Sequence, residues 1–334
     1  MPEEIIPNLY QLKLPIPDNP LGTVNAYAVT SADGVRLIDC GWNTPETYDA
    51  LVQELSGIGA KIADLREILL THIHPDHFGL AGRLVQESGA RTLMHRMDAV
   101  HLSTRYEDTT DLVEEMETWL RANGAPEPSV EPLAEGSLGM VVRVGPRRPD
   151  VLLDGGELLD WGRFRFEVVW TPGHSAGLIC LYEPNEQVFI SSDHVLEHIS
   201  PHIGMHAQSL GNPLGDYINS LREGRDLPVR VVLPGHGTPF NDLAKRVDEL
   251  LGHHERRFRQ MLAVLQEHEA TAYDVASQLS WAGMADGWNR LPPYQQRMAL
   301  IETVAHLEYL YGRSRVTKHT RNGLFYYRAA EPAD

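Results

Sequence analysis

A short stretch of the sequence carries four side chains that commonly bind metal ions. It reads THIHPDHFGLAG and places His72, His74, Asp76 and His77 within six positions. Histidines two residues apart in an extended loop point the same way, so His72 and His74 can share one metal ion. Asp76 and His77 lie one turn further along and can reach a second ion nearby. The alternative is a polar loop whose histidines are incidental.

Three further candidate ligands lie at the ends of strand-like runs much later in the chain. His174 occurs in TPGHSAG, Asp193 in SSDH and His236 in PGHG. Functional side chains gather on loops at strand ends, and a catalytic zinc ion takes about three protein ligands and keeps one position open. Each motif alone is weak, since an aspartate after a strand is often a helix cap. Together with the first stretch they predict a site for two metal ions.

The elements that would hold these residues alternate between strands and helices from Ile5 to about Leu233. Helices are predicted at 44–59, with Thr44 as the N-cap, and at 78–89. Runs rich in Val and Ile and bounded by Gly, Pro or Asp predict strands at 23–29, 35–39, 67–71, 91–95, 165–170, 177–182, 187–191 and 229–234. Such alternation predicts an α/β layered catalytic domain over residues 1–250.

The character of the sequence changes after this part. Helical stretches at 242–268, 271–280 and 294–312 precede two strands that turn at Asn322–Gly323, a strong hairpin signal. Three helices followed by a hairpin predict a small winged-helix module, so we expect a second domain at 251–334. Residues 104–150 are the least regular, with an acidic helical stretch and then a loop rich in Gly and Pro, which suits either a lid or an elaboration at the edge of the sheet.

The composition is that of an acidic globular protein. The chain has 334 residues and a formal net charge of −17, of which residues 1–252 carry −18. This disfavours nucleic acid as a partner, because phosphate contacts need clustered Lys and Arg. The two cysteines, Cys40 and Cys180, lie in strand-like runs, so we expect no disulfide framework. The sequence shows neither a membrane-length apolar stretch nor a secretory signal, so we expect a cytoplasmic protein without membrane contact.

The motifs THIHPDH, TPGHSAG, SSDH and PGHG, in that order, closely resemble those of the metallo-β-lactamase superfamily of hydrolases. The resemblance covers about residues 5–250 and implies a four-layer αββα sandwich with a dinuclear metal site at one edge. It assigns one metal ion to His72, His74 and His174 and the other to Asp76, His77 and His236, with Asp193 bridging. The run LIDCGW matches the Asp-x-Gly segment of the family, where Asp39 would support the metal loop without binding the metal. A turn aspartate is the alternative for Asp39.

This resemblance implies a hydrolase in which a hydroxide bridging two zinc ions attacks a small ester, thioester or lactone-like substrate. Asp76 is the expected catalytic residue, since it would bind a metal ion and also orient the hydroxide. Five histidines and two aspartates favour zinc, with iron or manganese as alternatives. The motifs identify no proton donor. Histidines at 194, 198, 202 and 206 follow Asp193 in a predicted loop. His206 is a candidate substrate contact or proton donor, with structural or exposed histidines as the alternative.

The C-terminal part, about residues 253–330, resembles the winged-helix tail of the β-lactamase-like protein 2 branch of the superfamily, through the stretch ETVAHLEYLYGRSRV. That branch implies an alternative function, a metal-dependent endoribonuclease or phosphodiesterase. Arg313, Arg315, Lys318 and Arg321 around the wing are candidate phosphate contacts. Four cations beside a strongly acidic domain make a weak footprint, so small-molecule hydrolysis is our first hypothesis.

Two further expectations come from this tail. A DNA-binding regulator that uses the hydrolase domain as a sensor is a third hypothesis, which a complete metal set disfavours. A homodimer is a candidate assembly, because this kind of tail commonly packs across subunits in related proteins. The basic helical tail with which glyoxalase II enzymes hold glutathione is not evident here, which argues against that substrate.

Overall fold

The structure is a computed structural model that describes residues 2–107, 110–135, 144–145, 147–207, 209, 211–281 and 287–331. The chain divides into two compact units. The first comprises Met1–Asp108, Met140–Pro201 and Ser220–Val247, and the second comprises Thr109–Gly139, His202–Asn219 and Asp248–Asp334. The second unit therefore contains all of the expected C-terminal domain at 251–334 and also two segments that the sequence analysis assigned to the catalytic domain at 1–250.

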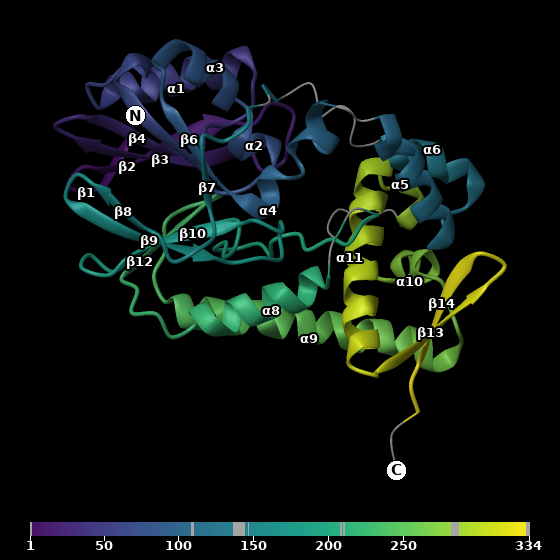
Figure 1. Ribbon diagram of the computed structural model, residues 1–334. Coiled ribbons are helices and arrows are strands. Elements are labelled where there is room, and N and C mark those ends of the chain that lie inside the picture. The colour runs from purple at the N-terminus through teal and green to yellow at the C-terminus, as the bar shows by residue number, and fades with distance from the viewer. Residues whose placement is uncertain are drawn as a thin grey trace. The chain divides into compact units, whose positions relative to one another are not determined.

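A seven-stranded sheet forms one half of the first unit (Figure 1). Its strands lie in sequence order: β1 (Glu3–Ile6), β2 (Leu9–Pro15), β3 (Thr23–Ser31), β4 (Gly34–Ile38), β5 (Leu65–Leu70), β6 (Arg91–His95) and β7 (Val151–Leu153). Strands β1 to β4 pair antiparallel and β4 to β7 pair parallel. Parallel neighbours need crossover connections, which here contain α1 (Pro45–Gly57), η1 (Ile62–Asp64), α2 (Pro75–Phe78) and α3 (Ala81–Ser88).

A five-stranded sheet in the order β12-β11-β10-β9-β8 forms the other half. Its strands are β8 (Leu158–Trp161), β9 (Phe164–Trp170), β10 (Ile179–Glu183), β11 (Val188–Ser192) and β12 (Val231–Pro234). Neighbours from β8 to β11 are antiparallel, and β12 joins β11 in parallel after a connection that contains α8 (Pro213–Gly224). All eight predicted strands are present, whereas the short strands β1, β2, β7 and β8 were not predicted.

The side chains of β3 show why the first unit is layered. Val24, Ala26 and Ala28 belong to an apolar cluster that includes Leu51 of α1 and Leu84 of α3. The alternate residues Tyr27 and Val29 belong to a second cluster, because successive side chains on a strand point to opposite faces. That second cluster also holds residues of the other sheet, among them Phe166, Val168, Ile179 and Leu181. The two sheets therefore pack face to face.

Helices cover the outer faces of both sheets. In Figure 1, α1 and α3 lie over the seven-stranded sheet. On the outer face of the five-stranded sheet, Val169 and Phe189 line a small cavity together with Leu221 of α8 and Leu243 and Val247 at the start of α9 (Leu243–Glu267). The first unit is thus the αββα arrangement that the family resemblance implied.

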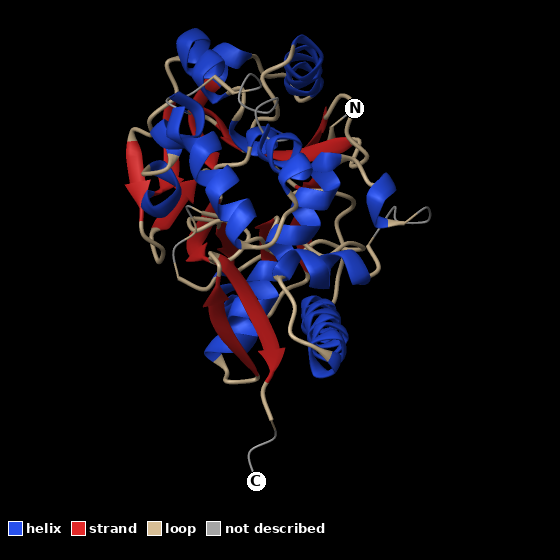
Figure 2. Cartoon of the chain, turned by 90° about the vertical axis from the view of Figure 1, so that its right-hand side faces the viewer, coloured by secondary structure: helices blue, strands red, loops and turns tan. Residues whose placement is uncertain are grey.

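The second unit is mainly helical. Its elements are α5 (Thr110–Ala122), α6 (Glu127–Glu135), most of α9, α10 (Ala272–Gln278), η3 (Trp288–Arg290), α11 (Pro293–Gly312), β13 (Val316–Arg321) and β14 (Leu324–Ala329). Figure 2 shows the β13–β14 hairpin as two adjacent arrows that lead to the C-terminus. Asn322 and Gly323 both have positive φ, at 51° and 80°, as a two-residue hairpin turn of the primed type requires. The predicted three helices and hairpin are confirmed, and their classification as a winged helix stays a prediction.

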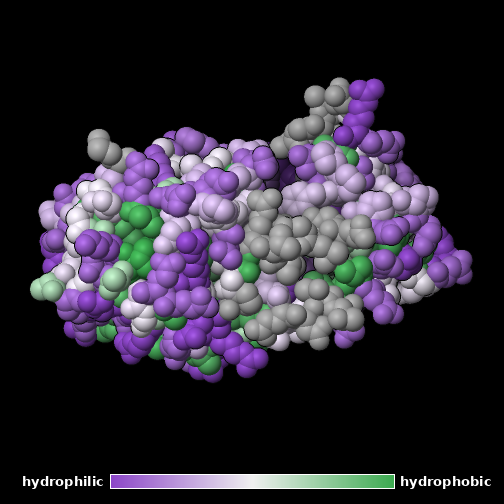
Figure 3. Space-filling view, turned by 90° about the horizontal axis from the view of Figure 1, so that it is seen from above, coloured by the Kyte–Doolittle hydropathy of each residue, from purple (hydrophilic) through white to green (hydrophobic). Residues whose placement is uncertain are grey.

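Hydrophilic residues dominate the coloured part of the face shown in Figure 3. Across the described residues, none of the helices combines the length and the apolar character that crossing a membrane would require. Part of the expected lid falls on residues 136–143 and 146, which lie outside the described residues. Helix α6 occupies the first part of the stretch where a loop rich in Gly and Pro was expected, with Pro132 inside the helix.

Candidate metal site

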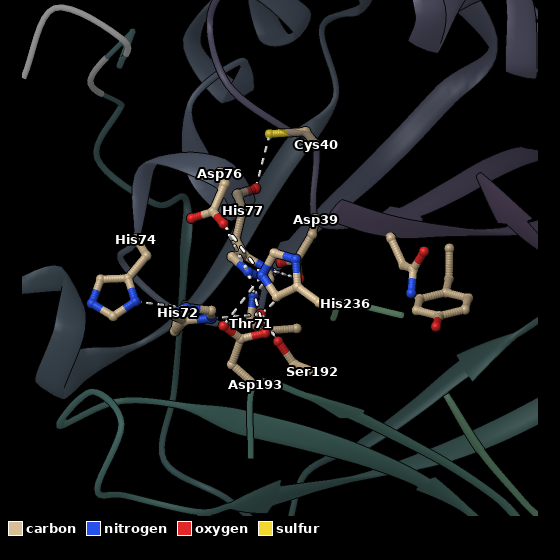
Figure 4. Close-up of polar contacts among 12 residues, drawn as sticks. Asp39, Cys40, Thr71, His72, His74, Asp76, His77, Ser192, Asp193 and His236 are labelled. Carbon is tan, nitrogen blue, oxygen red and sulfur yellow. Dashed lines mark hydrogen bonds and ion pairs between the residues drawn. The ribbon is translucent and has the colours of Figure 1, made fainter. Parts of the chain in front are cut away.

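The strand ends of both sheets bring the seven predicted ligand side chains together, and Figure 4 labels all of them except His174. The stretch 71–77 follows β5, His174 follows β9, Asp193 follows β11 and His236 follows β12. Their ligand atoms form three overlapping groups, each with atoms within 4.8 Å of one another: His72, His74 and His174; His72, His77 and Asp193; and Asp76, His77 and His236. Side chains up to 164 positions apart in the sequence thus meet in one place.

Three imidazoles form one side of this site. The distance from His72 Nε2 to His74 Nδ1 is 3.1 Å, and that from His74 Nδ1 to His174 Nε2 is 2.8 Å. Burial lowers the pKa of His72 and His74 well below the ordinary value, and the neighbouring histidines lower it further. Both rings are therefore neutral near pH 7, which is the form of histidine that binds metal ions.

Two carboxylates lie between this trio and the remaining histidines. Asp193 Oδ2 is 3.4 Å from His174 Nε2 and 3.5 Å from His236 Nε2, and its Oδ1 is 3.5 Å from His77 Nε2. Asp76 Oδ2 is 3.3 Å from His236 Nε2 and 3.8 Å from His77 Nε2. Asp193 therefore faces both groups of histidines, which is where a ligand shared by two ions would lie.

Two buried atoms at the centre lack the partners that buried polar atoms usually have. His77 Nε2 and Asp193 Oδ1 make no hydrogen bond within the described part of the chain, although the two side chains are 0% and 9% exposed. The donor set of imidazole nitrogens and carboxylate oxygens suits zinc and other divalent transition metals. The residues present therefore fit bound metal ions.

The rings are held by hydrogen bonds on the side away from the site. His77 Nδ1 donates to Asp39 Oδ2 at 2.7 Å, and His236 Nδ1 donates to the Thr23 carbonyl at 2.9 Å. Thr71 Oγ1 donates to Asp39, so it can accept from His72 Nδ1, which lies 3.1 Å away. Each of these bonds turns Nε2 toward the site, and such outer partners raise the affinity of histidine for metal ions.

Asp39 combines the two roles considered for it. Its φ of 61° is that of a turn residue. Its carboxylate also accepts hydrogen bonds from Thr71 N and Thr71 Oγ1, both at 2.8 Å, besides the bond from His77. Asp39 therefore holds both the start of the metal loop, residues 71–77, and the ring of His77.

The charges of the site are coupled. Burial opposes a positive charge on His77 and His236, but the carboxylates of Asp193 and Asp76 outweigh it, and the pKa of His236 rises to about 10. Burial likewise raises the pKa of Asp76, but the two histidines outweigh it and hold this pKa at about 2. In the absence of metal ions the carboxylates are therefore ionised and balanced by imidazolium groups.

The loop histidines after Asp193 belong to none of the three groups formed by the described residues. His194 is buried, and His198 is exposed and lies 3.1 Å from Glu197. His202 and His206 belong to the second unit, where His202 Nε2 lies 3.0 Å from the Met298 carbonyl. The expected loop is confirmed, and a substrate contact for His206 stays a prediction.

Sequence reasoning missed two side chains that contact the metal loop. Tyr106 OH donates to the Ile73 carbonyl at 2.8 Å, and Asp98 accepts from Ile73 N at 2.8 Å. Both lie outside the histidine motifs and have no spacing that would single them out. Only their distance from Ile73 in the folded chain reveals them.

Comparisons with known proteins agree with this geometry. Residues 19–236 match the family model of the metallo-β-lactamase superfamily. The chain is 26% identical over 322 residues to the "Probable metallo-hydrolase YqjP" of Bacillus subtilis, covering 92% of this chain and 94% of that protein. It is 30% identical over 156 residues to the "Beta-lactamase-like protein 2 homolog" of Caenorhabditis elegans, covering 46% of this chain and 44% of that one. The crystal structure of the metallo-β-lactamase family protein TTHA1429 from Thermus thermophilus matches with a TM-score of 0.83 at 33% identity, covering 97% of this chain and 99% of that one.

Proposed function

Because the chain belongs to the metallo-β-lactamase superfamily and is a metal-dependent hydrolase, we propose that it binds two zinc ions and cleaves a small ester, thioester or lactone. One observation carries this proposal. Five histidines and two aspartates from four strand ends converge with their ligand atoms facing one another, and Asp193 faces both groups of histidines. A single ion would leave part of this donor set unused.

In this proposal the ligands divide into two sets joined by one carboxylate. The three imidazoles of His72, His74 and His174 hold one ion, and Asp76, His77 and His236 hold the other, with Asp193 between them. Metal ions bound there would activate a water molecule for attack and polarise the carbonyl oxygen of the substrate. Iron or manganese would suit the same donors.

Asp76 has the surroundings expected of a residue that orients the attacking water. Its side chain is 17% exposed, whereas that of His77 beside it is 0% exposed. Its low pKa keeps it ionised near pH 7, so it can accept a hydrogen bond from water at a carboxylate oxygen. We therefore assign Asp76 to both metal binding and catalysis.

The charges of the wing support a small-molecule substrate over a nucleic acid. Lys318 Nζ lies 2.6 Å from Glu308 Oε1, and Arg321 NH1 lies 2.6 Å from Glu269 Oε1. Two of the four candidate phosphate contacts are thus engaged by carboxylates. The rest of the chain is strongly acidic, so the electrostatic attraction that RNA binding needs is weak here.

The test is a parallel turnover assay of the zinc-loaded full chain. One arm uses acyl-thioesters and lactones, and the other uses a chromogenic phosphodiester and single-stranded RNA. We expect metal-dependent turnover in the first arm that Asp76→Ala abolishes. Asp160→Ala is the matched control, because Asp160 on β8 is 74% exposed, lies 3.5 Å from Arg165 and belongs to none of the three ligand groups formed by the described residues. RNA cleavage that is lost in Asp76→Ala would establish the endoribonuclease alternative instead.

Three properties of the whole protein are part of the same proposal. The helices and hairpin of the second unit support a winged-helix module. A homodimer is proposed by analogy with related tails, and light scattering on the purified chain measures its mass directly. A cytoplasmic location is proposed from the sequence, and fractionation of cells that make the full-length chain would test it.

A further inference from the structure

A buried aspartate outside the ligand set lies against the metal loop. Asp98 is in the short helix α4 (Arg96–Ala99), which follows β6, and it is 1% exposed. Its Oδ2 accepts hydrogen bonds from Ile73 N at 2.8 Å and from Ser175 Oγ at 2.7 Å, and its Oδ1 accepts from Gly177 N at 2.7 Å. Three donors thus converge on one carboxylate, which compensates for its burial.

These donors come from two loops that carry ligands. Ile73 stands between His72 and His74, in the loop after β5 of the seven-stranded sheet. Ser175 follows His174 directly, in the loop between β9 and β10 of the other sheet. Asp98 therefore ties together the two loops that bring His74 Nδ1 to 3.1 Å from His72 Nε2 and to 2.8 Å from His174 Nε2.

The approach of Asp98 to the second loop depends on a glycine. A Cβ atom added to Gly177 would lie 2.5 Å from Asp98 N and 2.8 Å from Asp98 Cβ, closer than real Cβ contacts. A side chain at position 177 would push the loop away from α4, and His174 would move with it. Gly177, the second glycine of TPGHSAG, thus allows the close approach of this loop to Asp98, a role that the motif alone does not explain.

We propose that Asp98 is a positioning residue for the metal ion held by His72, His74 and His174, an inference that rests on the proposed two-ion function. Asp39 supports the site from the other direction, since it binds His77 and, through Thr71, also reaches His72. Asp98, by contrast, bonds to the residue between His72 and His74 and to residues just after His174, so its contacts lie beside the ligands of the three-histidine set. Loss of Asp98 therefore weakens one metal position, whereas loss of Asp39 weakens both.

The variant Asp98→Asn tests this sharply because it keeps the size of the side chain. Backbone N–H groups can only donate, and Ile73 N and Gly177 N lie on different oxygens of Asp98. Either orientation of an asparagine amide therefore turns its NH2 group toward a backbone N–H. Ser175→Ala is the milder variant, since it removes one bond and leaves both backbone bonds in place.

Asp150→Asn is the matched control. Asp150 Oδ2 also accepts from a backbone N–H and a hydroxyl, those of Thr92, at 2.9 and 3.0 Å. Thr92 lies in β6, so this carboxylate fastens a strand and not a ligand loop. A loss of stability without a change in metal binding is expected here.

The measurement is a zinc titration of the metal-stripped full chain against a chromophoric chelator, with melting temperatures recorded alongside. For Asp98→Asn we expect one of two zinc equivalents to bind about 10- to 100-fold more weakly, the size of effect seen for outer partners of metal ligands. For Ser175→Ala we expect a smaller weakening of the same equivalent. Equal weakening of both equivalents by Asp98→Asn, or a lower melting temperature with unchanged affinities, would overturn the proposal.

Double variants identify which position is affected. In a His236→Ala background, the Asp98→Asn change should weaken the binding of the zinc ion that remains. In a His174→Ala background, the same change should leave the affinity for the remaining zinc ion unchanged. The reverse pattern would contradict the assignment of Asp98 to the three-histidine position. Failure of the substrate proposal is separate, because wild-type protein that binds two zinc ions but cleaves no carbonyl substrate still permits every one of these measurements.

Discussion

Both units bury histidines in contact with one another, yet among the described residues only those of the first unit form groups that could hold a metal ion. In the first unit His74 Nδ1 lies 3.1 Å from His72 Nε2 and 2.8 Å from His174 Nε2. In the second unit His254 Nδ1 and His306 Nε2 are 3.0 Å apart, and both side chains are buried. Distance between imidazoles therefore does not distinguish the two clusters.

The difference lies in what surrounds the rings. His306 Nδ1 donates to the Glu302 carbonyl one turn earlier in α11, so its Nε2 is free to accept from His254 Nδ1. The pair is a hydrogen-bonded chain. Within the described residues His254 Nε2 is buried without a hydrogen bond, as His77 Nε2 is, so one such atom does not mark a metal site. Among the same residues, groups of three or more facing donors occur only where strand ends bring histidines and carboxylates together.

Replacing one histidine in each cluster should give the largest difference in turnover between variants. His174→Ala takes a ligand from the first unit and is expected to lower turnover by more than about a hundredfold, beyond the loss caused by an outer partner. His306→Gln keeps a polar side chain in α11 and should leave turnover unchanged while it lowers the melting temperature. Steady-state kinetics and thermal melts of both variants provide the comparison. Turnover that falls equally in both would mean that the second histidine pair also serves the reaction.

The histidines of the two units should also differ in their protonation state. Carboxylates raise the pKa of His77 and His236, the latter to about 10, so both rings are protonated near pH 7 without metal. Zinc binds only neutral imidazole, so its binding must release these protons, and the apparent affinity should rise with pH from 7 toward 10.

Calorimetry of zinc binding in buffers of different ionisation enthalpy measures this release. We expect about two protons for two zinc ions, one from each of these rings. His306→Gln is the control and should release the same number. A pH-independent affinity would show that the two histidines are neutral before zinc arrives, against the coupling described here.

Acid should lower the stability of the second unit, because its paired histidines have lowered pKa values. Burial lowers the pKa of His306 to about 3 and that of His254 well below its ordinary value. The unfolded chain then binds more protons than the folded one between about pH 6.5 and 3, so stability is lost as the pH falls through this window. Burial raises the pKa of Glu302 to about 7, which opposes the effect between that value and about 4.5.

Comparison of wild type with His306→Gln isolates the contribution of His306 to this pH dependence of stability. With zinc saturating, the free energy of unfolding of wild type should fall by on the order of 1 kcal/mol per pH unit more steeply than that of the variant. Parallel curves for the two proteins would exclude a titrating His306. Urea melts between pH 7 and 5 provide these values, since zinc binding holds the first unit in one protonation state.

The candidate ligands and the residue that positions them also differ in how far the sequence predicts them. The convergence of the seven candidate ligands was predictable because each is a distinctive residue type in a segment that follows a strand, and the resemblance of four ordered motifs supplied their grouping. Asp98 was not predictable, since RMDA in the sequence shows nothing of its contacts with Ile73 and Gly177. Hydrogen bonds between loops of different sheets exist only in the folded chain.

Segments 109–139 and 202–219 show a second limit. Local pattern predicts a helical stretch in the first of them and a loop at the start of the other, but it does not say which core a segment joins. In the second unit, Tyr273 N donates to the Asn123 carbonyl at 3.0 Å, and Met205 N donates to the Ile301 carbonyl at 3.0 Å. These long-range bonds tie the inserted segments to α10 and α11. Their partners are about 100 to 150 residues away in the sequence, beyond the reach of any periodicity.

The smallest expected effect concerns the wing of the second unit, whose ion pairs are partly exposed. Lys318 and Arg321 each lie 2.6 Å from a glutamate, and exposed pairs of this kind contribute little to stability because solvent screens them. Lys318→Ala should cost slightly more than Arg321→Ala, because Glu308 also accepts a 2.6 Å bond from Tyr327 OH and would be left with that one partner. Neither change should alter turnover of carbonyl substrates.

The same two variants are informative about the partner of the wing. If these cations only neutralise Glu308 and Glu269, binding of labelled single-stranded RNA by the full chain at low salt is weak in wild type and unchanged in both variants. A marked, salt-dependent loss of RNA binding in Arg321→Ala would show that phosphates compete with Glu269 for this side chain. The second unit would then be a recognition module, and the comparison of the two units would become one between catalysis and substrate capture.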